Sequence, residues 1–224
     1  MICVECGAAV GDVYKEFSAG NIRLTRCDSC CCIADKYVEF ETMLIIIDLI
    51  LHKVQVYRHI LFNNYSQDDE GLRRTVLKLI PAIVFFDTYL RWLRLRSLNM
   101  VPHDGYVMLF WMSAMELLVF VSAAVIAARL LHPGPIRYRH LMASIIISSF
   151  GKLLIVLIMI WETNSYYGPI VNLFVLSSNV TALRVSLNTP VTKAVLIVAT
   201  ACLTRLIVQI PLHVINPLIM FTIL

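Results

Sequence analysis

Six of the seven cysteines in the chain lie close to its start, between Cys3 and Cys32. Four of them form two C-x2-C pairs, Cys3/Cys6 and Cys27/Cys30, with twenty residues between the pairs. Two such pairs supply four thiolates, which is the donor set of a tetrahedral structural zinc site. Gly7 follows the first pair, where the tight turn of a zinc knuckle favours a residue that accepts a positive φ. The spacing therefore predicts one zinc ion bound by these four cysteines.

The predicted zinc is structural rather than catalytic. A module of about 30 residues buries too little apolar surface to fold by itself, and zinc would supply on the order of 10 kcal/mol. Four thiolates leave no open coordination position for a water molecule, which argues against catalysis. Cys31 or Cys32 could replace Cys30 as the fourth ligand, although the C-x2-C spacing favours Cys30. The alternative interpretation is that all these cysteines are ordinary thiols.

The composition is that of a multi-pass membrane protein. The 224 residues are 59% hydrophobic and 15% charged, whereas ordinary soluble domains are about half apolar and a quarter charged. The net charge of +4 is modest and the basic residues are scattered, so nucleic acid is not an expected partner. The first residues lack a basic segment followed by an apolar one, so we expect a retained, cytosolic N-terminus. In that reducing compartment, cysteines favour metal binding over disulfides.

The polar first part of the chain predicts a small β module followed by a helix at the membrane surface. Residues 1–39 contain the cysteine pairs and an alternating stretch typical of a strand, which predicts a zinc-ribbon-like module. Residues 40–63 are predicted to form an amphipathic helix that lies in the bilayer interface, because charges and histidines interrupt the apolar run. Residues 64–71 are predicted to be a polar linker.

Three polar residues mark one face of this predicted interfacial helix. Asp48, His52 and His59 recur at helical spacing, so a continuous helix would place them on one stripe. The functional interpretation is a membrane-surface stripe that contacts lipid headgroups or forms an acid–base pair. The plainer interpretation is the water-facing side that any interfacial helix requires.

The remainder, residues 72–224, is predicted to be the transmembrane region. Four segments are long and apolar enough to cross a bilayer, namely 105–128, 141–161, 168–187 and 191–210. A fifth segment, 76–95, is ambiguous because proline and charged residues interrupt it. If 76–95 also spans, the arginines of the loop 129–139 lie in the cytosol, as the positive-inside rule favours. The sequence therefore leaves four or five spans open.

Two charged side chains lie deep within predicted spans. Glu116 and Lys152 each lie about halfway along their span, near the middle of the bilayer. A lysine at that depth is about 15 Å from either surface, too far for its ammonium group to reach water. Charged groups at this depth usually pair or line a polar cavity. We predict an intramembrane ion pair between Glu116 and Lys152, the alternative being that each finds backbone or water separately.

Residues 1–63 contain five blocks that resemble the Arv family, in the order MICVECG, GNIRLTRCDSC, ADKYVEFE, IDLILHK and YRHILFN. The members of this family are endoplasmic-reticulum membrane proteins of sterol homeostasis. The resemblance implies a zinc-binding N-terminal motif followed by several spans, with Cys3, Cys6, Cys27 and Cys30 as the ligands. The triple cysteine at 30–32 departs from the usual pattern, and the hydrophobic remainder resembles the family only in character.

The resemblance also implies functions. It implies a role in sterol uptake, trafficking and distribution between membranes, with links to sphingolipid metabolism and to early glycosylphosphatidylinositol anchor assembly. The partners expected from it are membrane lipids, namely sterol, sphingolipid and glycosylphosphatidylinositol intermediates, and lipid-synthesis enzymes. Together with the composition, it predicts a mainly α, multi-pass transmembrane helical bundle with a small N-terminal zinc-ribbon-like β module and an interfacial amphipathic helix.

Three functions follow from these features. The first is non-enzymatic handling of sterol or a related lipid. The second is a membrane scaffold or lipid-presenting factor for glycosylphosphatidylinositol anchor assembly. The third, a membrane acyltransferase that uses one of the histidines, is disfavoured. The chain has no HExxH motif, serine-nucleophile elbow, P-loop or GxGxxG fingerprint, so we expect a protein without enzymatic activity.

Overall fold

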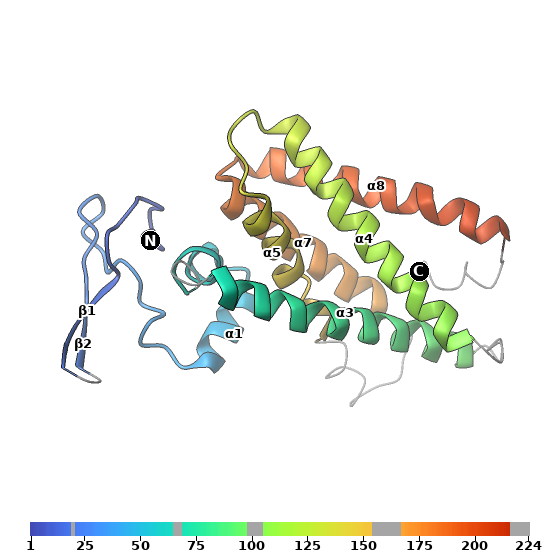
Figure 1. Ribbon diagram of the computed structural model, residues 1–224, viewed down its shortest axis with the longest axis horizontal. Helices are drawn as coiled ribbons and strands as arrows, with labels where there is room; N and C mark the ends of the chain where they lie inside the picture. The colour runs from blue at the N-terminus through green and yellow to red at the C-terminus, as the bar shows by residue number, and fades with distance from the viewer. Residues whose placement is uncertain (19–20, 65–68, 98–104, 154–166, 216–224) are drawn as a thin grey trace. The chain divides into compact units, whose positions relative to one another are not determined.

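The computed structural model describes residues 1–18, 21–64, 69–97, 105–153 and 167–215 (Figure 1). The chain divides into two compact units, Met1–Arg74 and Thr75–Leu224. The first unit contains the four clustered cysteines and the only strands among the described residues. The described part of the second unit is helical, so the polar module and the apolar bundle predicted from composition are distinct bodies.

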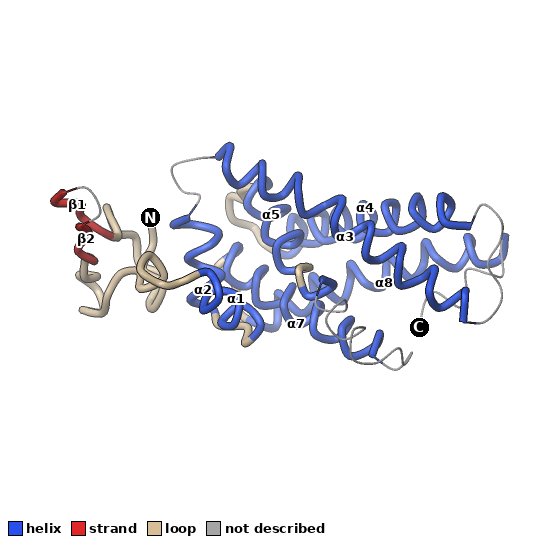
Figure 2. Tube along the Cα trace, turned by 90° about the horizontal axis from the view of Figure 1, so that it is seen from below, coloured by secondary structure: helices blue, strands red, loops and turns tan. Residues whose placement is uncertain are grey.

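The first unit begins with a small β module. Two antiparallel strands, β1 (Tyr14–Ser18) and β2 (Asn21–Leu24), form a hairpin, drawn in red in Figure 2. Every residue of β1 is exposed, so the hairpin contributes little buried apolar surface. The rest of the module is loop and turn, which is typical of a domain that relies on metal rather than on a large core. The predicted small N-terminal β module is confirmed.

Three short helical pieces follow the hairpin, where the sequence predicts one helix over 40–63. They are α1 (Thr42–Ile50), α2 (Val54–Arg58) and the π-helix η1 (His59–Asn64). The prediction of a continuous helix is wrong because His52 has a φ of +54°, and this left-handed conformation ends α1. The break and the wider π-helical turn rotate the later side chains to new faces. A single stripe of Asp48, His52 and His59 therefore does not form.

The segment predicted to be a linker, 64–71, is helical at both ends. Asn64 still belongs to η1, and α3 (Asp69–Ser97) begins inside the predicted linker. Residues 65–68 lie outside the described residues. Helix α3 continues through Pro81 without ending, so the ambiguous segment 76–95 is the central part of one long helix.

The described part of the second unit is a bundle built mainly from four further helices. They are α4 (Gly105–Leu131), α5 (Tyr138–Ser148), α7 (Tyr167–Leu187) and α8 (Val191–Ile215). Helix α4 packs along α8, α5 packs along α7, and α7 also contacts α8 (Figure 1). Ala124, Ala128, Ala194 and Ala201 are completely buried between them. Small residues let helix backbones approach closely, which is how helices associate where the hydrophobic effect is weak.

Three helices of the described chain are long and apolar enough to cross a membrane: Gly105–Leu131, Ile170–Leu187 and Val191–Gln209. They correspond to the predicted spans 105–128, 168–187 and 191–210. The segment 76–95 is not among them. The predicted span 141–161 is interrupted, because α5 ends at Ser148 and a turn occupies residues 149 and 150. Its part beyond residue 153 lies outside the described residues. The protein is thus a multi-pass helical membrane protein.

Candidate functional site

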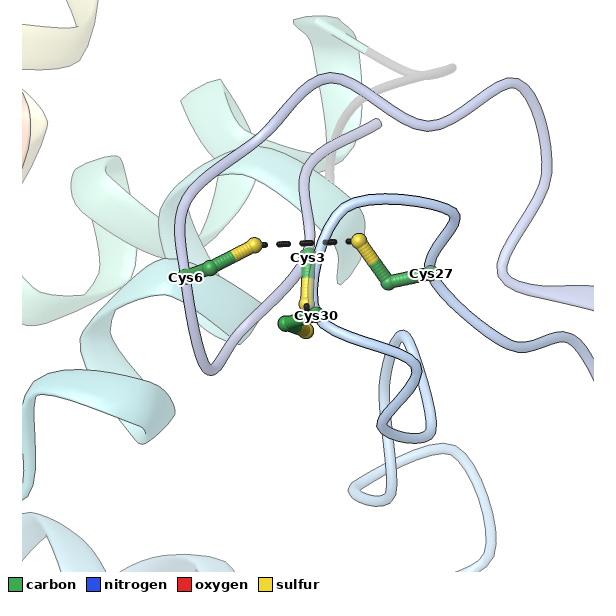
Figure 3. A group of neighbouring side chains, drawn as sticks. All are labelled: Cys3, Cys6, Cys27 and Cys30. Carbon is green, nitrogen blue, oxygen red and sulfur yellow. Dashed lines mark hydrogen bonds between the residues drawn. The ribbon is translucent and has the colours of Figure 1, made fainter.

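The sulfur atoms of the two cysteine pairs converge on one point (Figure 3). The Sγ atoms of Cys3, Cys6, Cys27 and Cys30 all lie within 4.8 Å of one another. Cys3 Sγ is 3.7 Å from Cys30 Sγ, and Cys6 Sγ is 3.7 Å from Cys27 Sγ. Each short distance thus joins one sulfur of the first pair to one of the second, which holds the two loops together.

These distances fit a metal ion held by four thiolates. In a tetrahedral site with metal–sulfur bonds of about 2.3 Å, neighbouring sulfurs lie about 3.8 Å apart. A disulfide would require about 2.05 Å, so the four cysteines are not paired as disulfides. The residues that the sequence predicts as ligands are therefore brought together in a geometry compatible with a metal site.

The two cysteine loops repeat the same hydrogen-bond pattern. The N–H of Cys3 donates to Ala8 O at 2.8 Å, and the N–H of Cys27 donates to Cys32 O at 2.8 Å. The N–H groups that follow Cys6 and Cys30 likewise donate back to the first cysteine of their own loop, at 2.9 and 2.8 Å. The isolated β-bridges that flank the loops, Ile2–Ala9 and Arg26–Ile33, occupy equivalent positions in the two loops. The module is thus two matching knuckles.

This match assigns roles to the extra cysteines. Cys31 takes the place of Gly7, and both have a positive φ, of +59° and +83°. Cys32 takes the place of Ala8, and its thiol is exposed, like that of Cys31. Neither belongs to the group of converging sulfurs, so neither replaces Cys30.

Backbone N–H groups inside the second knuckle stabilise a thiolate. Donation from Cys30 and Ser29 lowers the pKa of the Cys27 thiol to about 7. Burial raises the pKa of the Cys3 thiol above its ordinary value. Without metal, the four sulfurs are therefore not all ionised at neutral pH, and metal binding would displace protons.

The helix α2 fixes the first knuckle from outside. The guanidinium of Arg58 donates from Nη1 to the carbonyls of Val4 and Glu5, at 2.8 and 2.7 Å. A hydrogen bond from Gln55, assisted by Lys36, lowers the pKa of the Glu5 carboxyl. The helical segment therefore positions the backbone that carries Cys3 and Cys6.

A buried polar network lies beside the knuckles. Asp35 is completely buried, and its Oδ1 accepts the Tyr37 N–H at 2.9 Å. Its Oδ2 lies 2.7 Å from His59 Nδ1 and accepts from Asn63 Nδ2 at 2.7 Å. Asn63 also exchanges two hydrogen bonds with the backbone of Ile2, each 2.9 Å long. The network ties the chain start to η1.

The predicted membrane-surface stripe is wrong in this setting. Asp48 is buried, accepts from the Tyr37 hydroxyl at 2.9 Å and pairs with Lys53 at 2.7 Å. Burial opposes ionisation of Asp48, but the hydrogen bonds from Lys53 and Tyr37 hold its pKa below the ordinary value. His59 is also buried, and His52 occupies the turn between α1 and α2. Two of the three residues, Asp48 and His59, are therefore buried and make polar contacts inside the first unit.

The exposed face of α1 is apolar instead of polar. Met43 is 70% exposed, Ile47 50% and Leu51, just beyond α1, 61%. Leu44 and Ile46 are exposed as well. An apolar face of this kind is typical of a helix that lies against a membrane or another protein. The segment thus has the apolar contact face that an interfacial helix requires, whereas Asp48, predicted on the water-facing side, is buried.

In the second unit, Glu116 pairs with two arginines. Arg91 of α3 binds it with both terminal nitrogens, at 2.7 and 2.5 Å. Arg205 of α8 donates to the same carboxylate at 2.7 and 3.0 Å. Glu116 and Arg91 are both buried, so the pair is removed from solvent and lipid. One carboxylate thus joins three helices.

Lys152 pairs with Asp87 rather than with Glu116. Its Nζ lies 2.9 Å from Asp87 Oδ2, and Asp87 lies one helical turn before Arg91. The predicted Glu116–Lys152 pair is therefore wrong in its partners, although both residues are buried and paired. Helix α3 supplies the missing partners, because it carries an acid and a base one helical turn apart.

Sequence reasoning did not identify Asp35, Asn63, Asp87 or Arg91 as site residues. Asp35 and Asn63 fall inside two of the blocks that resemble the Arv family, which was the available signal. In α3 the available signal was the presence of Asp87 and Arg91 one turn apart in an apolar segment, since charged residues there usually pair with charges on neighbouring helices.

Comparison with known proteins places the chain in a family. The sequence model of the Arv1-like family matches residues 2–183. The chain belongs to the Arv1-like family. The match includes the four cysteines, Glu116 and Lys152, and it ends before Arg205. No solved structure matches the chain significantly.

Individual Arv1-like relatives resemble the chain over most of its length. It is 40% identical to the Protein arv1 homolog of Dictyostelium discoideum, over 93% of this chain and 94% of that protein. It is 38% identical to Protein ARV 2 of Arabidopsis thaliana, over 82% of each. It is 31% identical to Protein ARV1 of Homo sapiens, over 83% of this chain and 72% of that protein. The resemblance thus extends beyond residues 1–63, into the bundle.

Proposed function

We propose that the protein mediates sterol homeostasis in the endoplasmic-reticulum membrane, by handling or distributing sterol without catalysing a reaction. The observation that carries this proposal is the Arv1-like family match over residues 2–183, because the Arv family resemblance implies sterol trafficking. The three apolar helices support a location in a membrane. The same resemblance extends the proposal to sphingolipid and glycosylphosphatidylinositol intermediates as further lipids.

The four-cysteine centre is proposed to hold a structural zinc ion. A full set of four thiolates at tetrahedral spacing leaves no position for a reacting water, so the ion would fold the module. Zinc would hold the two knuckles together at the point where Arg58 anchors the first of them. The N-terminal unit is proposed to face the cytosol, where thiols stay reduced.

The apolar face of α1 supports work at a membrane surface. Several large side chains project from one short helix of a compact unit, and a bilayer interface accepts such a face. In this proposal the zinc module holds α1 against the bilayer, while the bundle remains embedded in it.

The experiment that tests the function uses a photoactivatable sterol. It is added to membranes that contain the protein, and labelling is competed with unlabelled sterol and with a glycosylphosphatidylinositol precursor. The proposal expects saturable labelling that sterol removes. If protein that retains its zinc shows no such labelling, direct sterol handling is excluded.

A second candidate function is a scaffold for lipid-synthesis enzymes, such as those of glycosylphosphatidylinositol anchor assembly. It is favoured by the compactness of Met1–Arg74, which forms its own unit and contains the four-cysteine cluster. A chimera that joins residues 1–74 to an unrelated membrane span would retain much of the cellular function if the scaffold is correct. A chimera that is stable but without function would exclude it.

A further inference from the structure

The first unit contains a pocket next to its buried polar network. The pocket has a volume of about 360 Å³, which lies in the lower range of small-molecule sites. Its walls come from the start of β1, the chain before α1, α1 itself and η1. The lining residues are Met1, Val13, Tyr14, Tyr37, Val38, Ile45, His59, Asn63 and Asn64.

One polar atom in this pocket is poised to meet a ligand. Asp35 accepts from Tyr37 and Asn63, as an ionised carboxylate does, so His59 must donate to it through a proton on Nδ1. In the neutral ring, the other nitrogen, Nε2, then carries a lone pair. Within the described part of the chain the structure gives Nε2 no partner, although His59 is buried, its exposed fraction being 6%.

Among the other polar groups of the wall, those of Asn63 and Tyr37 are occupied. Both hydrogens of the Asn63 amide are donated, to Ile2 and Asp35, and its oxygen accepts from Ile2. The Tyr37 hydroxyl donates to Asp48, so its ring faces the pocket as an apolar surface. The pocket thus offers the His59 Nε2 acceptor among walls that combine polar groups with apolar and aromatic side chains.

The charged side chains behind the pocket wall are two carboxylates. The Asp35 carboxylate lies directly behind His59, and Asp48 lies behind Tyr37. The lysines of this region are engaged, Lys36 with Glu5 and Lys53 with Asp48. Lys53 thus neutralises Asp48, and Met1, which carries the N-terminal ammonium group, also lines the pocket, so neither sign of charge is in clear excess. A phosphate would lie against the Asp35 carboxylate behind His59, whereas a neutral hydroxyl would meet the lone pair of a neutral His59 ring.

We propose that this pocket binds the hydroxyl-bearing end of an otherwise apolar lipid, with the hydroxyl donating to His59 Nε2. The inference rests on the proposed function for its first probe, a sterol, but the chemistry is shared by any neutral lipid alcohol, including ceramide. The pocket lies beside the exposed face of α1, since Ile45 forms its wall while Leu44 and Ile46 project outward. A lipid at that face reaches the pocket directly.

The π-helix explains how His59 and Asn63 serve this site together. In η1 the wider turn directs both side chains toward Asp35, and Asn64 reaches the pocket as well. π-Helical turns are rare, and they occur frequently at functional sites. The local distortion therefore accompanies a polar anchor rather than a purely apolar core.

The test compares neighbouring residues of α1 in the full-length protein. Ile45→Trp fills the pocket, whereas Leu44→Trp places the same side chain on the exposed face outside it. His59→Asn keeps a donor for Asp35 and removes the Nε2 position. Each variant is reconstituted in vesicles and labelled with the photoactivatable sterol, and labelled peptides are identified by mass spectrometry. Zinc content reports that the first unit is folded.

The proposal expects labelling of peptides from residues 1–64. His59→Asn should weaken labelling about tenfold, the effect of one buried hydrogen bond. Ile45→Trp should weaken labelling at least as much because it occupies the pocket, and Leu44→Trp should leave it unchanged. Ceramide that competes as well as sterol would support the shared alcohol chemistry and broaden the ligand. An anionic phospholipid that competes equally would overturn the proposal.

The remaining outcomes separate this inference from the proposed function. Saturable sterol labelling that maps to the bundle, and that zinc-loaded Ile45→Trp does not change, keeps the sterol function and overturns the pocket. If sterol does not label at all, the sterol function fails, and the pocket is then judged with photoactivatable ceramide. Ceramide labelling that Ile45→Trp removes supports the pocket, and its absence overturns it.

Discussion

At the scale of single residues, the four thiolates and their N–H donors decide what the first unit can bind. A zinc ion with four thiolates carries a net charge of −2. The backbone N–H groups of Ser29 and Cys30 stabilise part of that negative charge by donating to the Cys27 thiolate. The first knuckle has a comparable donor, because the Ala8 N–H lies 3.5 Å from Cys6 Sγ. The backbone of each loop thus prepares its sulfurs for a cation.

The first prediction concerns which cysteines hold the metal. Serine at Cys3, Cys6, Cys27 or Cys30 should abolish tight zinc binding, because each removes one of four converging thiolates. Serine at Cys31 or Cys32 should leave one zinc per chain, because these thiols lie outside the cluster. Zinc content of the purified protein, measured by elemental analysis, checks both. Zinc loss in the Cys31 or Cys32 variant would contradict the assignment.

The second prediction is the pH dependence of zinc affinity. Affinity should fall as pH falls, by about tenfold per pH unit for each thiol that is protonated in the metal-free protein. The raised pKa of Cys3 makes it contribute above pH 7, and the Cys27 thiol adds its own proton below about 7. A plot of the logarithm of zinc affinity against pH should therefore become steeper below pH 7. Competition against a chromophoric chelator on both sides of pH 7 measures it, and a constant slope would contradict the role of Cys27.

At the scale of elements, the breaks in helices matter as much as the helices. The left-handed His52 separates α1 from α2, which leaves α1 with its apolar face outward and Asp48 inward. In the bundle, the turn after α5 brings Gly151 against α7. Both arrangements depend on backbone conformations that the apolar pattern of the sequence does not reveal.

The third prediction concerns this close approach. A Cβ at Gly151 would lie 2.6 Å from the ring of Phe174 and 3.1 Å from Val175, so Gly151→Ala requires the ring to shift. We expect it to cost about 1–3 kcal/mol of stability through overpacking. Gly11→Ala is the matched control, because nothing lies within 4 Å of its Cβ. Thermal stability of the detergent-purified protein compares them, and equal values would refute the close packing.

At the scale of the whole molecule, a buried charge network joins helices that are distant in the sequence. Glu116 links α4 to α3 through Arg91 and to α8 through Arg205, and Lys152 reaches α3 through Asp87. Charges within a membrane bundle persist when they are paired, since an unpaired one is costly. The network therefore fixes how these helices register against each other.

The fourth prediction follows from this pairing. Glu116→Ala leaves the buried Arg91 without its bidentate partner and should cost about 3–5 kcal/mol. Adding Arg91→Ala should restore part of the stability, whereas adding Lys152→Ala should not, because Lys152 pairs with Asp87. Arg205→Ala should cost less, since Arg205 is partly exposed. The amount of monodisperse protein after extraction measures this order, and rescue by Lys152→Ala would support the original pair instead.

The sequence by itself determined the features that depend on residue type and local spacing. Two C-x2-C pairs at this spacing predict two matching knuckles, so the four cysteines that converge could be identified without a structure. Long apolar runs must be helical in a membrane, so the segments at 105–128, 168–187 and 191–210 could be predicted as spans. The depth of Glu116 and Lys152 also showed that both would be buried and paired.

Tertiary structure alone decided the partners. Which side chain meets Glu116 depends on how α3, α4 and α8 pack, and these contacts join residues 25 and 89 positions apart. Whether Asp48 and His59 share one face depended on the left-handed residue between them, His52, because one change of φ redirects every side chain that follows it. Local sequence patterns determine which buried polar and charged side chains need a hydrogen-bond or ion-pair partner. Only the packed chain determines which residue supplies that partner.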